Sequence, residues 1–147
     1  MKIAMACDHG GLELKNTVKA HLEEKGYEVE DFGTYTKESC DYVDFGAKAA
    51  KAVASGECEK GIVICSTGIC MSICANKVKG IRCALLSDLL SARMTRRHND
   101  ANMMAMGQNL TAPTYALEIV DTWLDTPFDG GRHQRRIDKI TALENEQ

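Results

Sequence analysis

Cys65 lies where a short apolar run of the sequence gives way to small residues. The run Gly61–Ile64 is typical of a buried strand, and Ser66–Gly68 permits a tight turn before a helical pattern that begins at Ile69. A thiol at this junction lies beside the N-terminus of a helix, whose unpaired N–H groups and partial positive charge bind anions and stabilise a thiolate. Two interpretations remain open: a nucleophile or base beside an anion site, or a buried structural cysteine.

Further polar clusters follow other apolar runs in the same way. They are Cys7–Gly11, Ser87–Asp88 and Gly107–Asn109. Ligands of parallel sheets bind at the carboxyl ends of the strands, so we expect these clusters to face a common crevice with Cys65. Asp8 could serve either as a helix N-cap or as a ligand of the substrate, and His9 either as a loop residue or as a second ligand.

The same residues argue against several kinds of site. The dinucleotide fingerprint G-x-G-x-x-G is absent, and Asp-His-Gly-Gly stands where a flavin mononucleotide site needs a hydroxyl-rich phosphate loop. A cysteine phosphatase needs an arginine six positions after its nucleophile, and Met71 stands there. Cys65, Cys70 and Cys74 have no paired C-x-x-C spacing, which argues against a zinc site and against a dithiol redox centre. We therefore expect neither a metal nor a cofactor.

Two basic stretches differ in what they indicate. Arg93–Asp100 closes a helical pattern, where arginines favour a helix C-terminus, so a solvated role is expected for Arg93, Arg96 and Arg97. His98 in this stretch is different, because histidine is the side chain suited to acid–base chemistry near neutral pH. Gly130–Arg136 opens the last helical pattern, and Arg132 and Arg136 share one face of it. Cations are unfavourable at a helix N-terminus, so bound phosphate explains these two arginines better than a solvated face does.

Strand and helix patterns alternate along the chain. Strands are expected at Lys2–Cys7, Tyr27–Phe32, Gly61–Cys65, Arg82–Leu86 and Asn102–Gly107. Helices are expected at Gly11–Lys25, Ile69–Lys77 and Leu89–Arg97, and at about 42–55, 113–124 and 132–144. This alternation predicts an α/β fold, with a parallel sheet covered by helices on both faces.

Length and composition predict one globular domain spanning residues 1–147. The net charge of -3 gives no reason to expect nucleic acid or an anionic membrane as partner. No apolar run approaches the ~20 residues of a membrane span, and the N-terminus indicates a strand rather than a signal peptide. The seven cysteines are expected to be reduced thiols in a cytoplasm.

Together these motifs resemble the type B ribose-5-phosphate isomerases, within a wider family that includes galactose-6-phosphate and allose-6-phosphate isomerases. The resemblance covers nearly the whole chain. Its motifs are CDHGG at Cys7–Gly11, DFGTY at Asp31–Tyr35, C-x-T-G-x-x-M-S-I at Cys65–Ile73, ANKVKGIR at Ala75–Arg82, SARMTRRHNDAN at Ser91–Asn102 and GGRHQRRIDKI at Gly130–Ile140. It implies a Rossmann-like three-layer α/β/α sandwich with a five-stranded parallel sheet, dimers or tetramers, and metal-free aldose–ketose isomerisation.

Carried over position by position, the resemblance makes Cys65 the base that moves a proton between C1 and C2 of the open sugar phosphate, with Thr67 orienting it. His98 matches the residue that opens the sugar ring by acid–base chemistry. Backbone N–H groups match an anion hole for the enediolate; they belong to Ser66, Thr67, Gly68, Ile69 and Cys70. Contacts to the sugar hydroxyls and ring match Asp8, His9, Asn99 and, less closely, Tyr42. Arg132 and Arg136 match phosphate ligands, on a C-terminal helix expected to contribute to the dimer.

The chain departs from the family pattern at three positions. The family loop usually reads Cys-Gly-Thr-Gly-x-Gly, and here Ser66 and Cys70 replace two of its glycines. Asn109 stands where many members place an arginine that helps to hold phosphate. These changes are expected to alter the shape of the loop, the width of the pocket or the affinity for phosphate.

Topology predicts that each active site is shared between two subunits. Asp8 and Cys65 follow strands and so lie at the carboxyl edge of the sheet, whereas His98 and Asn99 follow a helix and lie at the amino edge. The leading function is interconversion of D-ribose 5-phosphate and D-ribulose 5-phosphate. The alternatives are a hexose 6-phosphate isomerase, acting on allose or galactose phosphates, a non-catalytic sugar-phosphate sensor and a redox thiol protein.

Overall fold

The computed structural model describes all 147 residues and contains five strands and six α-helices in alternation. The strands are β1 (Lys2–Cys7), β2 (Glu28–Asp31), β3 (Lys60–Cys65), β4 (Cys83–Leu85) and β5 (Met103–Gly107). The helices are α1 (Leu12–Glu24), α2 (Tyr42–Ala54), α3 (Ile69–Asn76), α4 (Leu89–Asn99), α5 (Pro113–Asp125) and α6 (Arg132–Asn145), and a short 3₁₀ turn, His9–Gly11, precedes α1. Every element expected from the sequence is present, with boundaries that differ by one or two residues.

All five strands are parallel and follow the order β2-β1-β3-β5-β4 across the sheet. At the carboxyl ends Cys7 pairs with Ile64, and Cys65 pairs with Gly107. The loops that follow β1, β3 and β5 therefore emerge side by side at one edge of the sheet, which is where open α/β sheets bind their ligands.

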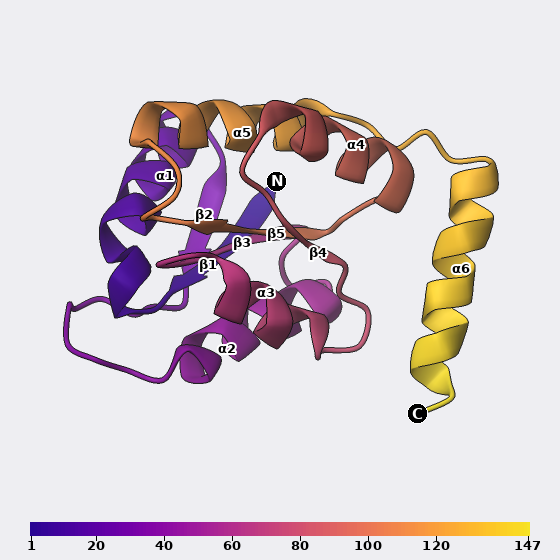
Figure 1. Ribbon diagram of the computed structural model, residues 1–147, viewed down its shortest axis with the longest axis horizontal. Helices are drawn as coiled ribbons and strands as arrows, with labels where there is room; N and C mark the ends of the chain where they lie inside the picture. Colours follow the sequence, from indigo (N-terminus) through magenta and orange to yellow (C-terminus); the bar gives the residue numbers. More distant parts are fainter.

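Helices cover both faces of the sheet and make three layers (Figure 1). Helices α1, α4 and α5 pack on one face, where Val18 and Trp123 join Ile62 in a core cluster of 17 buried residues. Helices α2 and α3 pack on the other face, where Met71 and Val63 belong to a second cluster of 14 residues. The expected three-layer α/β/α sandwich is confirmed. None of its helices is both long and apolar enough to cross a bilayer.

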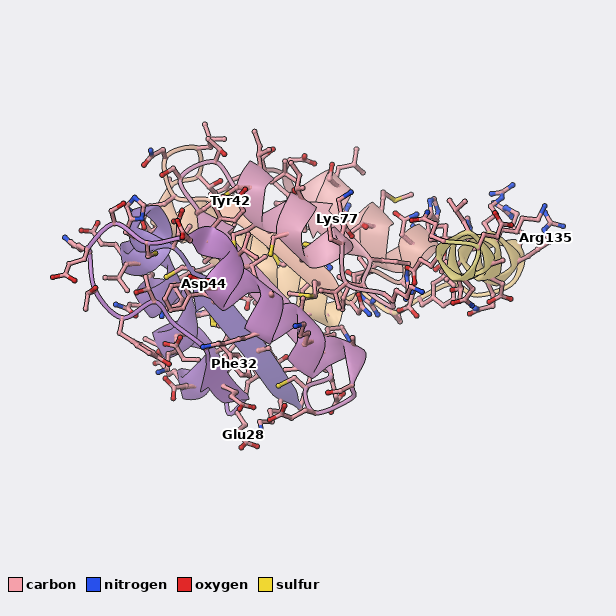
Figure 2. All side chains as sticks on the ribbon, turned by 90° about the horizontal axis from the view of Figure 1, so that it is seen from below. Glu28, Phe32, Tyr42, Asp44, Lys77 and Arg135 are labelled. Atoms are coloured by element: carbon pink, nitrogen blue, oxygen red, sulfur yellow. The ribbon has the colours of Figure 1, made fainter.

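Helix α6 lies at the end of the molecule opposite α1 and meets the body at few points (Figures 1 and 2). Its first turn contacts α4, and Glu144 near its end accepts a hydrogen bond of 2.9 Å from the Gly80 N–H. Only His133 and Ile137 of this helix are buried, and the apolar side chains of Ile140 and Leu143 remain 43% and 56% exposed. A cavity of about 470 Å³ separates Ile140 and Leu143 from residues around β4. Helix α6 thus presents an apolar strip that its own sheet does not cover.

The end of α4 differs from expectation in a way that concerns two residues. The helix continues to Asn99, so that His98 lies in its last turn, and it stops at Asp100 with a left-handed φ of 43°. Arg96 is buried rather than solvated, because its guanidinium donates hydrogen bonds to Asp100 Oδ1 at 2.7 Å and to the Ala101 carbonyl at 2.8 Å. These bonds close the helix end and set the direction in which the chain enters β5.

A buried lysine fixes the loop that follows β2. The Lys15 side chain is fully buried, and its Nζ donates to Asp31 Oδ1 at 2.8 Å and to the Thr34 carbonyl at 2.6 Å. The ring of Tyr35 lies 5.0 Å from the same nitrogen. An ammonium group without water needs all of these partners, so Lys15 attaches α1 to the loop that leads on to α2.

We expect Lys15→Met to lower the free energy of unfolding by about 3–5 kcal/mol, because it leaves the Asp31 carboxylate largely buried without its main partner. Lys19 Nζ lies 3.6 Å from Asp31 Oδ2 and remains as a partner in the variant, so we expect the loss of stability to be near the lower end of that range. The measurement is urea unfolding at one fixed protein concentration.

The matched control is Lys37→Met, which removes an equally short 2.8 Å pair with Glu13 that lies in solvent. Exposed pairs contribute little, so this variant should unfold at the wild-type urea concentration. Equal effects of the two substitutions would contradict a stabilising role for the buried pair.

Candidate active site

The Cys65 thiol lies at the junction of β3 and α3, at the carboxyl edge of the sheet. The residue is 1% exposed, and its Sγ accepts a hydrogen bond of 3.0 Å from the backbone N–H of Gly68. Gly68 is the N-cap of α3 and has a φ of 80°, a left-handed conformation that glycine adopts without strain. This bond holds the sulfur of Cys65 against the N-terminus of α3, where unpaired N–H groups carry partial positive charge.

The turn after Cys65 packs closely against neighbouring backbone. A Cβ added to Gly107 at the end of β5 would lie 2.6 Å from the Thr67 carbonyl carbon. The Thr67 hydroxyl accepts a hydrogen bond of 3.3 Å from the N–H of Ile69, the first residue of α3. Thr67 and Ile69 are both exposed, so this turn presents side chains and N–H groups at the surface beside Cys65.

The two side chains that replace glycines of the family loop, Ser66 and Cys70, are half-buried beside Cys65. The Ser66 hydroxyl packs against Gly10, where any added Cβ would collide with it. Burial, together with a hydrogen bond to the Cys65 thiol, raises the pKa of Cys70 to about 12. Cys70 therefore stays a neutral thiol next to Cys65, and the two side chains take up space that glycines would leave open.

Asp8 and His9 follow β1 and extend the same edge of the sheet. The Asp8 side chain accepts a hydrogen bond of 2.9 Å from the Gly10 N–H, so this carboxylate does act as an N-cap, here of the 3₁₀ turn. The exposed His9 ring accepts a hydrogen bond from the Cys40 N–H through Nδ1 at 3.3 Å, and the Cys40 Sγ is 3.8 Å from the same nitrogen. We refer to Asp8, His9 and residues 65–70 as the Cys65 site.

Two further predicted residues have simpler environments. Tyr42 is the first residue of α2 and is 38% exposed, on the surface of the layer that α2 and α3 form (Figure 2). Asn109 follows β5 and donates its backbone N–H to the Ser66 carbonyl at 3.0 Å. It lines a polar cavity of about 330 Å³ whose other residues include Glu13 and Gln108.

His98 lies in a second group of residues, built from the end of α4 and the start of α6. Its ring stacks on the ring of His133, with centroids 4.2 Å apart and planes inclined by 12°. Asn99, the next residue, accepts hydrogen bonds from Thr95 at its side chain and from Arg82 at its carbonyl. We refer to these residues, with Arg132 and Arg136 on the exposed face of α6, as the His98 site.

Three side chains of this region lie close enough together to be considered as metal ligands. One donor atom each from His98, Asp129 and His133 lies within 4.8 Å of the others. Stacked rings direct their nitrogen lone pairs side by side rather than toward one point, and Arg97 Nε already pairs with Asp129 Oδ2 at 3.2 Å. The two arginines of α6 add further positive charge, so the group suits an anion better than a cation.

Within one chain the Cys65 site and the His98 site are separate. The Cys65 site is built from loops after β1 and β3 and reaches the β2–α2 loop through Cys40. The His98 site contacts Arg82, which precedes β4 and so lies at the amino edge. Figure 1 shows α6 at the end of the molecule opposite α1 and the β2–α2 loop. The structure thus brings Asp8, His9 and Cys65 together, and separately His98, Asn99 and the arginines of α6.

Sequence reasoning missed His133 and Cys40, which touch His98 and His9. A signal for His133 was present, because it lies between Arg132 and Arg136 on the helix already assigned to phosphate. No pattern indicates Cys40, whose contact spans 31 residues of sequence across a loop.

Comparison with known proteins gives a consistent result. The sequence pattern of the ribose/galactose isomerase family matches residues 3–140. Ribose-5-phosphate isomerase B of Escherichia coli (strain K12) is 48% identical over 143 residues, 97% of this chain and 96% of that protein. The structure of ribose-5-phosphate isomerase B of Clostridium thermocellum superposes with a TM-score of 0.98 at 53% identity, over 99% of both chains. D-erythrulose-4-phosphate isomerase of Pectobacterium atrosepticum is 38% identical over 148 residues, 100% of this chain and 97% of that protein.

Proposed function

The chain belongs to the ribose/galactose isomerase family, and from that premise we propose that it interconverts D-ribose 5-phosphate and D-ribulose 5-phosphate. The observation that carries the proposal is the buried Cys65 thiol, held 3.0 Å from the Gly68 N–H at the start of α3. This arrangement offers a base and an anion site in one turn of chain. The reaction would make the protein an enzyme of pentose phosphate metabolism.

In the proposed reaction the Cys65 thiolate removes the proton from C2 of the open aldose. The electron pair of that C–H bond forms the C1–C2 double bond of an enediolate, and O1 takes up the negative charge. N–H groups at the start of α3 stabilise this charge. Return of the proton to C1, with transfer of the O2 proton to O1, leaves the ketose and regenerates the thiolate. We assign Thr67 to orienting the thiol, because its hydroxyl accepts the Ile69 N–H within the same turn.

Ribose 5-phosphate exists mainly as a closed ring, so a ring-opening step must come first. We assign this step to His98, which donates a proton to the ring oxygen while the C1–O4 bond breaks and the O1 proton leaves to water. Asp8, His9, Tyr42 and Asn99 contact the sugar, and Arg132 and Arg136 hold the phosphate. Asn109 replaces an arginine in this part of the site and weakens that hold.

The separation of the two groups within one chain supports a homodimer in which each active site combines the Cys65 site of one subunit with the His98 site of the other. Helix α6, with its uncovered Ile140 and Leu143, fits such an interface. Leu85 and Leu110 add exposed apolar surface next to Thr67, and a pair of dimers would give a tetramer. All seven cysteines are free, which suits the cytoplasm.

Ser66 and Cys70 bear on the length of the substrate. Both side chains occupy space beside Cys65, which favours a five-carbon chain over the six carbons of allose or galactose 6-phosphate. One relative is named a D-erythrulose-4-phosphate isomerase, so a four-carbon sugar phosphate should be tested as the substrate shorter than ribose 5-phosphate.

The test measures kcat/KM with ribose 5-phosphate, allose 6-phosphate and erythrose 4-phosphate. We expect ribose 5-phosphate to be preferred over allose 6-phosphate by roughly 10–200-fold, the discrimination that one additional carbon gives in a confined pocket. Substituting Ser66→Gly and Cys70→Gly together should narrow this preference. A higher value for allose 6-phosphate would assign the chain to the hexose phosphates, and no turnover of any sugar phosphate would leave the sensor function.

A further inference from the structure

The stack between His98 and His133 joins α4 to α6 at the base of the α6 arm. His98 is half-buried in the last turn of α4, while His133 is 8% exposed in the first turn of α6. Their rings lie almost parallel with centroids 4.2 Å apart, close enough for direct contact over the ring faces. The flat face of His133 therefore limits how the His98 ring can turn about its own side-chain bonds.

The charged groups around the stack decide which ring carries a proton. Burial lowers the pKa of His133, and the charges of His98, Arg132 and Arg136 lower it further, with only Asp129 acting in the opposite direction. Asp129 is itself paired with Arg97 of α4 at 3.2 Å. Two protonated rings in face-to-face contact repel each other, so one proton at most is favoured on the stack near neutrality. The lowered pKa of His133 disfavours a proton on that ring of the pair.

We propose that His133 is a positioning residue for ring opening: its flat ring stacks on that of His98, so that His98 meets the sugar ring in one orientation. This inference rests on the proposed function, because it assigns a partner to the residue that opens the ring. It also explains why an aromatic, titratable side chain lies between two arginines on the buried side of α6.

Comparing a substrate that must be ring-opened with substrates that cannot form a furanose ring separates this role from a structural one. Ribose 5-phosphate must be opened, ribulose 5-phosphate has no furanose form because its O5 carries the phosphate, and erythrose 4-phosphate has none because its O4 does. We expect His133→Ala to lower kcat on ribose 5-phosphate about 10-fold, as a misoriented acid–base group does. Turnover of the two open-chain substrates should change less than about twofold.

Two variants complete the comparison. His133→Phe keeps a flat ring on His98 but cannot be protonated, and we expect it to fold and to retain most of the ring-opening rate. Arg135→Ala is the control, because Arg135 lies on the outer side of the same helix and is exposed (Figure 2). It should match the wild type with all three substrates.

Proton NMR of the His98 ring gives a readout that a purely structural role would not change. In the wild type and in Arg135→Ala, the His98 titration should be broadened by its coupling to His133. In His133→Phe it should become a single simple step, because no second proton competes.

Equal losses of His133→Ala with closed and open substrates, no loss with either, or an unchanged His98 titration in His133→Phe would each overturn the inference. His98→Asn serves as the reference. If His98→Asn loses turnover mainly with ribose 5-phosphate and His133→Ala does not, only the positioning role of His133 fails. If His98→Asn loses turnover equally with closed and open-chain substrates, the ring-opening role in the proposed function fails as well.

Discussion

Cys65→Ala is expected to abolish isomerisation while leaving the binding of sugar phosphate largely intact. The thiolate acts on a carbon-bound proton, and its loss should lower kcat by ~10²–10⁴-fold or more, as for other general bases. In the proposed site the phosphate is held elsewhere, by Arg132 and Arg136 of α6, a helix that lies apart from β3 and Cys65 within the chain. The turn keeps its shape in the variant because backbone bonds hold it: Gln108 donates its N–H to the Cys65 carbonyl at 2.9 Å, and Asn109 donates its N–H to the Ser66 carbonyl at 3.0 Å.

The measurement has two parts. Initial rates with ribulose 5-phosphate avoid any contribution from ring opening, and calorimetric titration with ribose 5-phosphate gives the affinity. Exchange of the C2 proton of bound aldose with deuterated solvent adds a direct test of the base, because wild-type protein should exchange it and Cys65→Ala should not. Protein that binds ribose 5-phosphate and exchanges no proton even as wild type would be a sensor.

Cys74→Ala is the matched control, since Cys74 is a buried cysteine of α3, the helix that follows Cys65, and packs against Gly46. It should keep wild-type turnover, which separates loss of the base from loss of packing around α3. Near-native turnover of Cys65→Ala would end the assignment of Cys65 as the base.

The sequence predicted the fold well because its signals are local. Apolar runs such as Lys60–Cys65 and the helical spacing of Leu14, Val18 and Leu22 each lie within one element, and all of these residues except Lys60 are buried as expected. Alternation of strands and helices then leaves few arrangements, of which the parallel sheet is the favoured one. Errors are confined to ends, as at α4, where a capping network around Arg96 extends the helix by two residues.

What local patterns could not predict are contacts between distant residues. Lys15 has the charge of a surface residue, and only its pairing with Asp31 across 16 residues makes it a buried one. The stacking of His98 on His133 depends on how α6 leaves the body of the molecule, and the chain between α5 and α6 gives no periodic signal for that direction. The Cys65 site followed from the strand-end rule. The family resemblance supplied His98, Asn99, Arg132 and Arg136 of the other site, and the fold added the contact of His98 with His133.

Mixing two inactive variants, Cys65→Ala and His98→Ala, is expected to restore activity on ribose 5-phosphate. In the proposed dimer each site takes Cys65 from one subunit and His98 from the other. A mixed dimer then has one site with both substitutions and one site with neither. Random pairing makes about half of the dimers mixed, so activity should recover to roughly a quarter of the wild-type value.

The assay must start from ribose 5-phosphate, because an open-chain substrate would bypass the His98 substitution. Exchange of subunits is promoted by mild denaturant and dilution and verified by native mass spectrometry. If exchange is complete and activity stays at the level of the separate variants, both residues act within one subunit and the shared site is wrong. A stable monomer with wild-type activity would lead to the same conclusion.

Two further mixtures test which residues of the shared site come from the same subunit. His98 and Arg136 lie on the same side of that division, because the stack of His98 on His133 holds the end of α4 against the start of α6. In a mixed dimer of His98→Ala with Arg136→Ala, each site therefore contains one damaged residue, and no activity should return at substrate concentrations below KM. Cys65→Ala mixed with Arg136→Ala should recover as the first pair does, since those residues come from opposite subunits. Recovery of activity in all three mixtures would indicate that the subunits merely stabilise one another. Recovery only in the two mixtures that contain Cys65→Ala would establish that the base comes from one chain and that the ring-opening and phosphate-binding groups come from its partner.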